Sequence, residues 1–312
     1  MEKEVVAWKN KGKTIDINGH QIFYIKEGDG PNLLILHGYP FNTFEWKYVW
    51  EDLVKKYSVF TFDYLGMGFS DKPQDYEYSF HEHCEIVNYL LGHWGIKKTH
   101  ILSHDLGVSI VQELLDRDLA AQNCFEIQSV VFMNGGLFMD SYKPRMIQRL
   151  LSQSPKPIGK FLSKLLTKKK LEKSIKSIFG PNTQPTDQLI NQFWDILNYN
   201  DGKSIAYLIG RLVFDKLKHQ ERWISAMQST KIPMCFINGP FDPNSGIHMA
   251  NRYKELIPHP NVKLLQQDIG HWPQIEDPSG VLSYYKEFRD EILNTPNSNS
   301  CLLYTSDAAD DL

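Results

Sequence analysis

One short segment of the chain combines an acidic side chain with the small residues that a sharp turn needs. Ser103-His104-Asp105-Leu106-Gly107 follows an apolar run and precedes a helical pattern. A reactive side chain at the apex of a strand-to-helix turn needs small residues on both sides, because the strained backbone leaves no room for bulky ones. Ser103 and Gly107 flank Asp105 in this way, and the N-terminus of the following helix favours an ionised carboxylate. The segment therefore predicts a nucleophilic aspartate, although alone it would equally suit an aspartate that caps a helix.

Two later residues could act together with Asp105. Asp242 lies in a loop that follows the apolar run 233–237, and His271 follows the run 262–265. Taken singly, Asp242 would be an ordinary turn residue before Pro243, and His271 a structural histidine. Taken together, nucleophile, acid and base occur in the order, and at the strand ends, of a catalytic triad with a nucleophile elbow. We therefore predict that Asp242 orients His271 and that His271 activates a water molecule.

The segment His37-Gly38-Tyr39-Pro40 could receive a developing negative charge. It follows the apolar run 33–36, and Gly38 allows the backbone to approach a bound molecule. The backbone N–H groups of Tyr39 and Leu106 would then form an oxyanion hole. An ordinary turn at a glycine and a proline is the alternative interpretation of the same residues.

The elements that must position these residues alternate along the chain. An antiparallel hairpin is predicted for residues 14–17 and 21–25, because Asn18-Gly19 tolerates the positive φ angles of a tight turn. Buried strands are predicted at residues 33–36, 59–62, 99–102, 127–133, 233–237 and 262–265, and helices at 44–55, 79–94 and 106–119. This order predicts an α/β fold with a mostly parallel central sheet and helices on both faces.

The alternation stops after the strand at 127–133. Residues 135–227 contain helical patterns but no strand-like run, so we predict a helical lid inserted between two strands of the sheet. The predicted core then comprises residues 8–134 and 228–294. Residues 295–312 are predicted to form a disordered tail, and residues 301–312, which continue no periodic pattern, are interpreted as a non-native addition.

Composition excludes several classes of protein. The 312 residues carry a net charge of −3, which gives no general attraction to nucleic acid. Four dispersed cysteines argue against a disulfide scaffold or a cysteine-rich zinc site. His81 and His83, two apart on a predicted helix, point in different directions, so no metal site is predicted there. No signal peptide or transmembrane segment is visible, which predicts a cytoplasmic or endoplasmic-reticulum-associated protein. Association with a membrane stays open, but it would not depend on a visible transmembrane segment.

These motifs resemble those of a known superfamily. The segments carrying the resemblance are His37-Gly-Tyr-Pro40, Asp63-Tyr-Leu-Gly-Met-Gly-Phe-Ser-Asp-Lys-Pro73, Asp105 with its flanking residues, Asp242 and His271. In this order they resemble the α/β-hydrolase superfamily, and within it the epoxide hydrolase and haloalkane dehalogenase branch. Leu106 and Tyr39 stand where haloalkane dehalogenases carry the tryptophan and asparagine that hold halide. Halide stabilisation is therefore not implied.

The resemblance implies an α/β-hydrolase fold and a reaction that needs no cofactor. Asp105 would attack an electrophilic carbon of a small apolar substrate, forming an ester that the water activated by His271 would hydrolyse. Residues interpreted as contacting the substrate are His37, Tyr142, Tyr207 and Trp272. Two alternatives stay open: an ester or lipid hydrolase on the same scaffold, and a non-catalytic interaction protein that retains a hydrolase fold.

Overall fold

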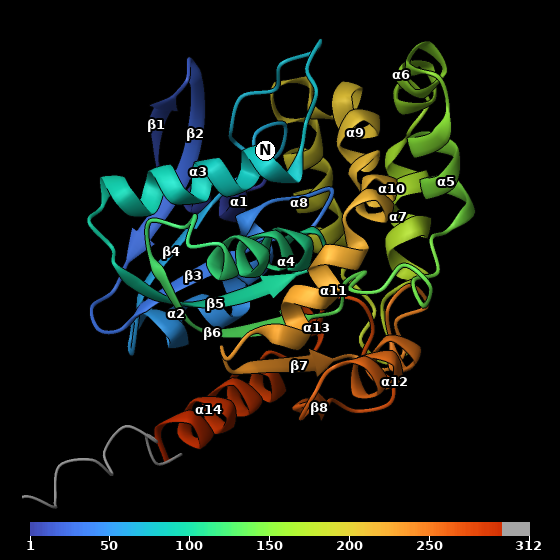
Figure 1. Ribbon diagram of the computed structural model, residues 1–312. Coiled ribbons are helices and arrows are strands. Elements are labelled where there is room, and N and C mark those ends of the chain that lie inside the picture. Colours follow the sequence, from blue (N-terminus) through green and yellow to red (C-terminus); the bar gives the residue numbers. More distant parts are fainter. Residues whose placement is uncertain (295–312) are drawn as a thin grey trace, which may run out of the picture.

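The central feature of the fold is one mixed β-sheet, seen in a computed structural model that describes residues 1–294, apart from the side chains of residues 147 and 150–152. Eight strands of this described part pair in the order β1-β2-β4-β3-β5-β6-β7-β8 (Figure 1). Their bounds are β1 Lys13–Ile17, β2 His20–Glu27, β3 Asn32–Leu36, β4 Ser58–Phe62, β5 Lys98–His104, β6 Glu126–Met133, β7 Met234–Asn238 and β8 Val262–Leu264. The β1–β2 and β2–β4 pairs are antiparallel and the others parallel, which confirms the predicted sheet. The predicted tail, 295–312, lies outside the described residues.

The turn between β1 and β2 shows how local sequence fixes the start of the sheet. Asn18 has a φ angle of 54° and Gly19 one of 82°, which is the positive-φ pair that a tight hairpin turn needs. Ile17 then pairs with His20 across the turn. The hairpin predicted from Asn18-Gly19 is confirmed.

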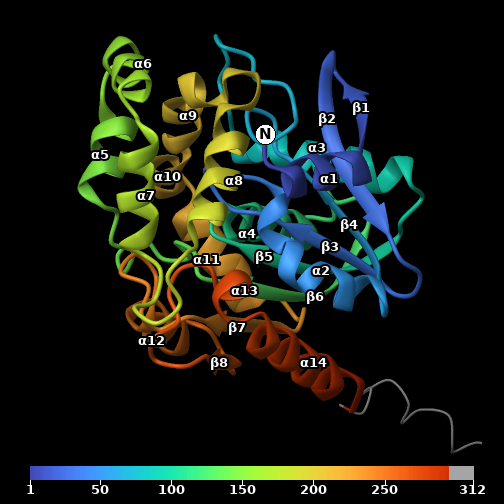
Figure 2. The ribbon, with the colours of Figure 1, turned by 180° about the vertical axis from the view of Figure 1, so that it is seen from behind.

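The parallel strands are buried because helices cover both faces of the sheet. In β3, Leu34 and Leu36 belong to one apolar cluster, whereas Leu33 and Ile35 belong to the other. The first cluster lies under α3 (Phe80–His93), α4 (Leu106–Leu119) and α12 (Ile247–Leu256), and the second under α2 (Lys47–Val54) and α14 (Pro278–Asn294). Figures 1 and 2 show these two layers from opposite sides. Apolar residues at every strand position thus follow from burial on two faces.

A helical insertion separates β6 from β7. Its elements are α5 (Met146–Gln153), α6 (Lys156–Lys164), α7 (Lys168–Lys176), α8 (Asp187–Asn198), η2 (Tyr199–Asp201), α9 (Gly202–Gly210), α10 (Leu212–Asp215), η3 (Lys216–Lys218) and α11 (Gln220–Ser229). In Figure 1 the arrowheads of β5 and β7 point toward the side that this insertion occupies. The boundary predicted at 227 falls inside α11, which packs along α4.

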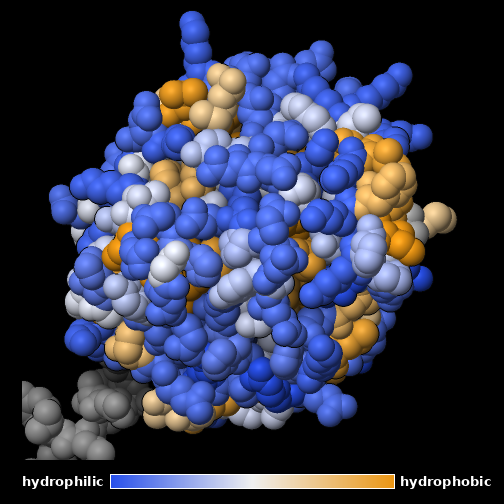
Figure 3. Space-filling model, turned by 90° about the horizontal axis from the view of Figure 1, so that it is seen from above, coloured by the Kyte–Doolittle hydropathy of each residue, from blue (hydrophilic) through white to orange (hydrophobic). Residues whose placement is uncertain are grey.

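The insertion carries several exposed apolar side chains. Met146, Ile158, Phe161 and Leu165 are all largely exposed on α5, on α6 and just after it. Figure 3 shows apolar surface along the side of the molecule on which these helices lie. Within residues 1–294, no helix is both long and apolar enough to cross a membrane.

An N-terminal helix, α1 (Lys3–Lys11), was not expected from the sequence. It begins before the predicted core and buries Val5 and Trp8. The Trp8 ring lies edge-on to Trp50, with ring centres 5.2 Å apart, and its indole N–H donates to Thr43 Oγ1 at 3.1 Å. A helix of nine residues has too few apolar positions for its periodicity to be recognised, and its burial depends on residues that are distant in sequence.

Replacing Trp8 should therefore destabilise the whole fold. For Trp8→Ala we expect the free energy of unfolding in urea to fall by about 3 to 5 kcal/mol, because a large buried aromatic ring is lost. The control is Lys3→Ala on the exposed side of α1, which should change it by less than about half a kcal/mol. Equal effects of the two substitutions would contradict the packing of α1 on the core.

Candidate active site

Asp105 occupies a strained turn between β5 and α4. Its φ angle is 47° and its ψ angle −105°, a backbone conformation that residues with a side chain rarely adopt. Two glycines make room for this turn. A Cβ on Gly38 would lie 2.8 Å from the Asp105 Cβ, and one on Gly107 would lie 2.7 Å from the Leu36 carbonyl oxygen. The neighbouring Ser103 is fully buried and donates its hydroxyl to the Val131 carbonyl at 3.1 Å, so only Asp105 presents a reactive group at the turn.

The three residues predicted as a catalytic set lie together. His271 Nε2 is 3.5 Å from Asp105 Oδ2, and His271 Nδ1 is 2.8 Å from Asp242 Oδ2. Asp242 follows β7 and His271 follows β8, so the carboxyl ends of the parallel strands bring them to one edge of the sheet. The imidazole therefore stands between two carboxylates.

Asp242 is held by hydrogen bonds on both oxygens. Its Oδ2 accepts from Ser245 Oγ at 2.6 Å and from Asn134 Nδ2 at 3.1 Å, and its Oδ1 accepts from the Asn244 N–H at 2.8 Å. Burial alone would raise the pKa of Asp242, but the charge and hydrogen bond of His271, together with Ser245 and the Asn244 N–H, lower it to about 2. Sequence analysis missed Asn134; its position directly after β6, next to the nucleophile's strand, was the available signal.

The two carboxylates govern the charge of His271. Burial would lower the pKa of the imidazole, but Asp242 and Asp105 outweigh it and raise the pKa to about 10. In return, although burial alone would raise the pKa of Asp105, His271 holds it well below the ordinary range, with smaller contributions from His104 and Lys216. At neutral pH the site thus holds two carboxylates and one imidazolium.

The two oxygens of Asp105 have different surroundings. The backbone N–H of Tyr39 donates to Oδ1 at 2.9 Å, whereas Oδ2 faces His271. The other predicted oxyanion donor, Leu106, is the first residue of α4, so its amide belongs to the first turn of that helix. The Asp105 side chain keeps 15% of its surface exposed.

A buried hydrogen-bond network that sequence analysis missed holds the loops around Asp105 and His271 in place. Glu45 Oε1 accepts from the Gly38 N–H at 3.0 Å and from Gln274 Nε2 at 3.1 Å, and lies 2.8 Å from His104 Nδ1. The other nitrogen of His104 lies 2.8 Å from the His271 carbonyl oxygen. The two ring nitrogens of His104 thus face two different oxygens, one of a side chain and one of the backbone. The network ties the loop of the Tyr39 amide to the backbone of His271.

Asp63 anchors the same loop from a second side. It is fully buried, and its carboxylate accepts hydrogen bonds from Asn42 Nδ2, from the N–H and hydroxyl of Thr43, and from the Phe69 N–H, at 2.7–3.0 Å. The conspicuous segment 63–73 thus packs against the loop beside the site. The Asp63 carboxylate has a structural role, since these four hydrogen bonds all come from the two loops.

The other predicted contact residues are placed in different ways. His37 stacks on Tyr64 with ring centres 3.9 Å apart, accepts from the Tyr64 N–H at Nε2, and has Nδ1 2.8 Å from the Gly38 carbonyl oxygen. Trp272 packs edge-on to His271 at 4.8 Å. Tyr207 lies against Gly159 of α6. Tyr142 is buried; burial raises the pKa of its hydroxyl, and the charge of the Asp105 carboxylate raises it further. Direct contact of these four residues with a substrate stays a prediction.

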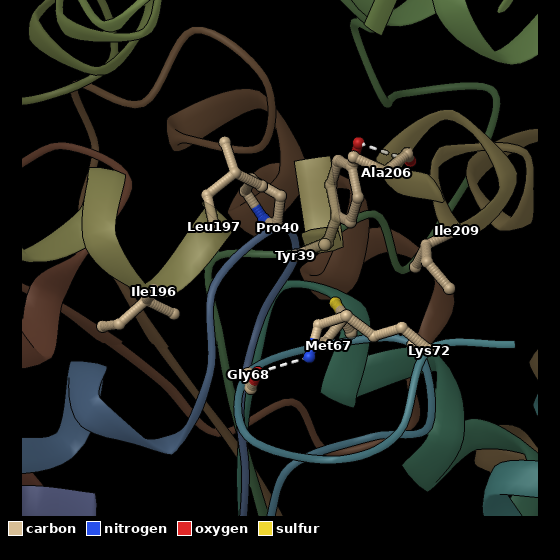
Figure 4. Close-up of a pocket in the computed structure, with 11 residues that line it drawn as sticks. Tyr39, Pro40, Met67, Gly68, Lys72, Ile196, Leu197, Ala206 and Ile209 are labelled. Carbon is tan, nitrogen blue, oxygen red and sulfur yellow. Dashed lines mark hydrogen bonds between the residues drawn. The ribbon is translucent and has the colours of Figure 1, made fainter. Parts of the chain in front are cut away.

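A small cavity lies between Tyr39 and the insertion. Figure 4 shows the Tyr39 ring reaching Ala206 of α9, where its hydroxyl donates to the Ala206 carbonyl at 2.9 Å. The cavity has a volume of about 10 Å³, room for one water molecule at most. Its lining includes Lys72 and apolar residues of α8 and α9, but neither Asp105 nor His271. The insertion is therefore packed closely over the loop that carries Tyr39.

Comparison with known proteins gives the site its context. Residues 31–278 match the family model described as alpha/beta hydrolase fold. The mesoderm-specific transcript protein of Mus musculus is 33% identical over 291 residues, covering 90% of this chain and 87% of that protein. Among solved structures, the epoxide hydrolase CorEH matches with a TM-score of 0.74 at 18% identity, covering 90% of this chain and 99% of that chain. The haloalkane dehalogenase DbeA from Bradyrhizobium elkani matches with a TM-score of 0.76 at 16% identity, covering 90% and 98%. The resemblance read from the motifs is confirmed, and the structural likenesses establish the fold.

The raised pKa of His271 predicts how stability varies with pH. A histidine whose pKa is higher in the folded than in the unfolded state stabilises the fold below its ordinary pKa of 6.5, and this contribution is lost as pH rises through about 10. The difference in melting temperature between the wild type and His271→Gln should therefore decrease as the pH is raised from 6.5 to 10. Asp242→Asn, which removes the carboxylate at 2.8 Å, should flatten this slope. A difference independent of pH would contradict a protonated His271.

Proposed function

The chain belongs to the alpha/beta hydrolase fold family, and on that premise we propose that it is a hydrolase whose Asp105 forms a covalent ester with its substrate. The substrate that suits this chemistry is a small apolar molecule with an electrophilic carbon, such as an epoxide. The proposed core comprises residues 8–134 and 228–294, and the proposed lid residues 135–227. The proposal rests on one observation: the carboxylate of Asp105, at the apex of a strained turn, is held by an amide on one oxygen and faces a histidine with the other.

The asymmetry of the Asp105 carboxylate supports a nucleophilic role. Because Oδ1 accepts from the Tyr39 N–H, Oδ2 is the oxygen left to attack. Asp105 is ionised at neutral pH, so the first step needs no base. Oδ2 forms a bond to the substrate carbon, and the electron pair of the broken bond leaves on the departing oxygen. The product of this step is an ester of Asp105.

Ester formation changes the state of His271. Before attack, two carboxylates hold the imidazole in its protonated form. Once Asp105 is esterified, its negative charge is gone, and only Asp242 still favours the proton. The pKa of His271 falls, and the ring can release a proton to solvent and act as a base. The first step thus prepares the base for the second.

The second step releases the product. Neutral His271 takes a proton from water, and the hydroxide attacks the carbonyl carbon of the Asp105 ester. The negative charge that develops on Oδ1 is stabilised by the Tyr39 amide and, in our proposal, by that of Leu106. The ester bond breaks, and the departing alkoxide takes the proton from His271 to give the product alcohol. The carboxylic acid left on Asp105, which carries one oxygen from water, then passes its proton to the neutral imidazole, so the carboxylate and the imidazolium are both restored.

The competing functions fit the site less well. A serine-based ester hydrolase would need a free hydroxyl at the apex, but Ser103 is buried and bonded to Val131. A non-catalytic interaction protein would have no use for two carboxylates around one buried imidazole, because buried charges destabilise a fold unless they are fully paired.

Trapping the ester tests the proposed mechanism. In His271→Gln the first step should proceed and the second should stop, so styrene oxide should leave a stable adduct on the peptide that contains Asp105. Mass spectrometry of the digested protein measures this adduct. The matched control, His271→Gln with Asp105→Ala, should show none. Absence of an adduct from both proteins would contradict the covalent scheme.

Isotope and substrate experiments test the wild type. During turnover in water enriched in oxygen-18, Asp105 itself should gain the label, because water attacks its carbonyl carbon. Styrene oxide should be hydrolysed faster than a p-nitrophenyl ester, and Asp105→Ala should lower epoxide turnover by at least about 10⁴-fold. Ester hydrolysis that survives Asp105→Ala while epoxides are untouched would favour the ester hydrolase instead.

A further inference from the structure

Lys216 is a buried cation that the mechanism above does not use. It is the first residue of η3, in the insertion, and only 4% of its surface is exposed. Asp215, on the same turn, is engaged with Lys218 at 2.6 Å and His219 at 3.7 Å. In the described part of the chain, the only charge that offsets the burial of the Lys216 ammonium is Asp105, the proposed nucleophile.

The position of the ammonium is fixed by the loop that follows β6. A Cβ on Gly136 would lie 3.3 Å from Lys216 Nζ and 3.0 Å from the ring of Tyr142, so both side chains approach this glycine. A Cβ on Gly135, the preceding residue, would lie 2.7 Å from the Asp105 carbonyl oxygen. The Lys216 nitrogen also lies 5.8 Å from the centre of the Tyr142 ring. Lys216 therefore reaches from the insertion to the loop that packs against the turn carrying Asp105.

A second buried lysine shows what a structural role looks like in this protein. The Lys72 ammonium donates to the carbonyl oxygens of Gly68 at 2.6 Å and Ser70 at 2.8 Å, and lies over the Tyr199 ring. Those contacts satisfy its charge within the fold. Lys216 has no comparable set among the described residues, so its ammonium can still donate to a bound molecule.

The proposed first step supplies an acceptor for that donor. Before the step, the negative charge lies on Asp105 and balances Lys216; after it, the same charge lies on the oxygen that has left the substrate carbon. Building on the proposed function, we propose that Lys216 protonates the alkoxide formed when Asp105 opens a three-membered cyclic ether. One N–H bond of the ammonium breaks and one O–H bond forms. The lysine becomes neutral and later regains a proton from solvent.

The chemistry of the leaving atom makes this proposal specific. An alkoxide is strongly basic and leaves readily only if it receives a proton, whereas a halide leaves as a stable anion. Burial lowers the pKa of Lys216 to about 8, with Asp105 opposing this effect, and an acid of that strength is suited to general acid catalysis near neutrality. Lys216 should therefore favour opening of a cyclic ether over displacement of a halide.

The test compares two reagents on the same trapped enzyme. In the His271→Gln parent, single-turnover rates of adduct formation on Asp105 are measured by intact-protein mass spectrometry with styrene oxide and with benzyl bromide. Adding Lys216→Met should lower the styrene oxide to benzyl bromide rate ratio by at least about 100-fold. Lys216→Arg, which keeps the buried charge but does not give up a proton, should lower the ratio similarly. The control, Lys72→Met, should keep the styrene oxide to benzyl bromide rate ratio of the parent.

The outcomes separate this inference from the proposed function. If neither reagent labels Asp105 in the parent, the covalent mechanism itself is wrong. If both reagents label it and either Lys216 variant keeps the parent's ratio, proton donation by Lys216 is wrong while the mechanism stands. The ratio cancels general damage to the site, and the arginine variant serves should the methionine variant fail to fold.

Discussion

A single imidazole shared between two carboxylates is the interaction on which the rest of the site depends. Asp105 and Asp242 lie on opposite sides of the His271 ring, and the cation between them favours the ionised form of both, the fully buried Asp242 and the partly exposed Asp105. The fold must therefore hold three loops, from three different strands, within hydrogen-bond reach of one another. The parallel sheet achieves this because its strands end at a common edge.

The surrounding polar network explains how such a cluster keeps its geometry. Glu45 and His104 form a second buried pair, joined by a hydrogen bond, which also engages the Gly38 N–H, the His271 carbonyl and the Gln274 amide of α13 (Pro273–Glu276). Buried hydrogen-bonded networks of this kind rigidify a site, and removal of one partner leaves a costly unpaired group. The strained backbone of Asp105 can persist because these contacts determine its neighbours on both sides.

The predictable part of the site is the part encoded by local sequence. Asp105, Asp242 and His271 follow recognisable strands, so their order alone placed them at one edge, and the hairpin at Asn18 was readable from two residues. Glu45 was not predictable, because its partners His104 and Gln274 lie 59 and 229 residues away. The burial of Lys216 was not predictable, because it begins the three-residue η3, which is too short for a sequence period to show which of its sides is buried. His37 has both ring nitrogens directed at backbone groups, and its predicted contact with a substrate stays a prediction.

Tyr39 connects the insertion to the reactive centre, because its backbone and its side chain bind different parts of the molecule. The Tyr39 amide holds the carboxylate oxygen, while its phenol is bonded to α9. Any outward swing of α9 breaks the phenol's bond and removes the restraint on the loop that aims the amide. The packing of the insertion and the position of the amide that holds the nucleophile are therefore coupled through one side chain.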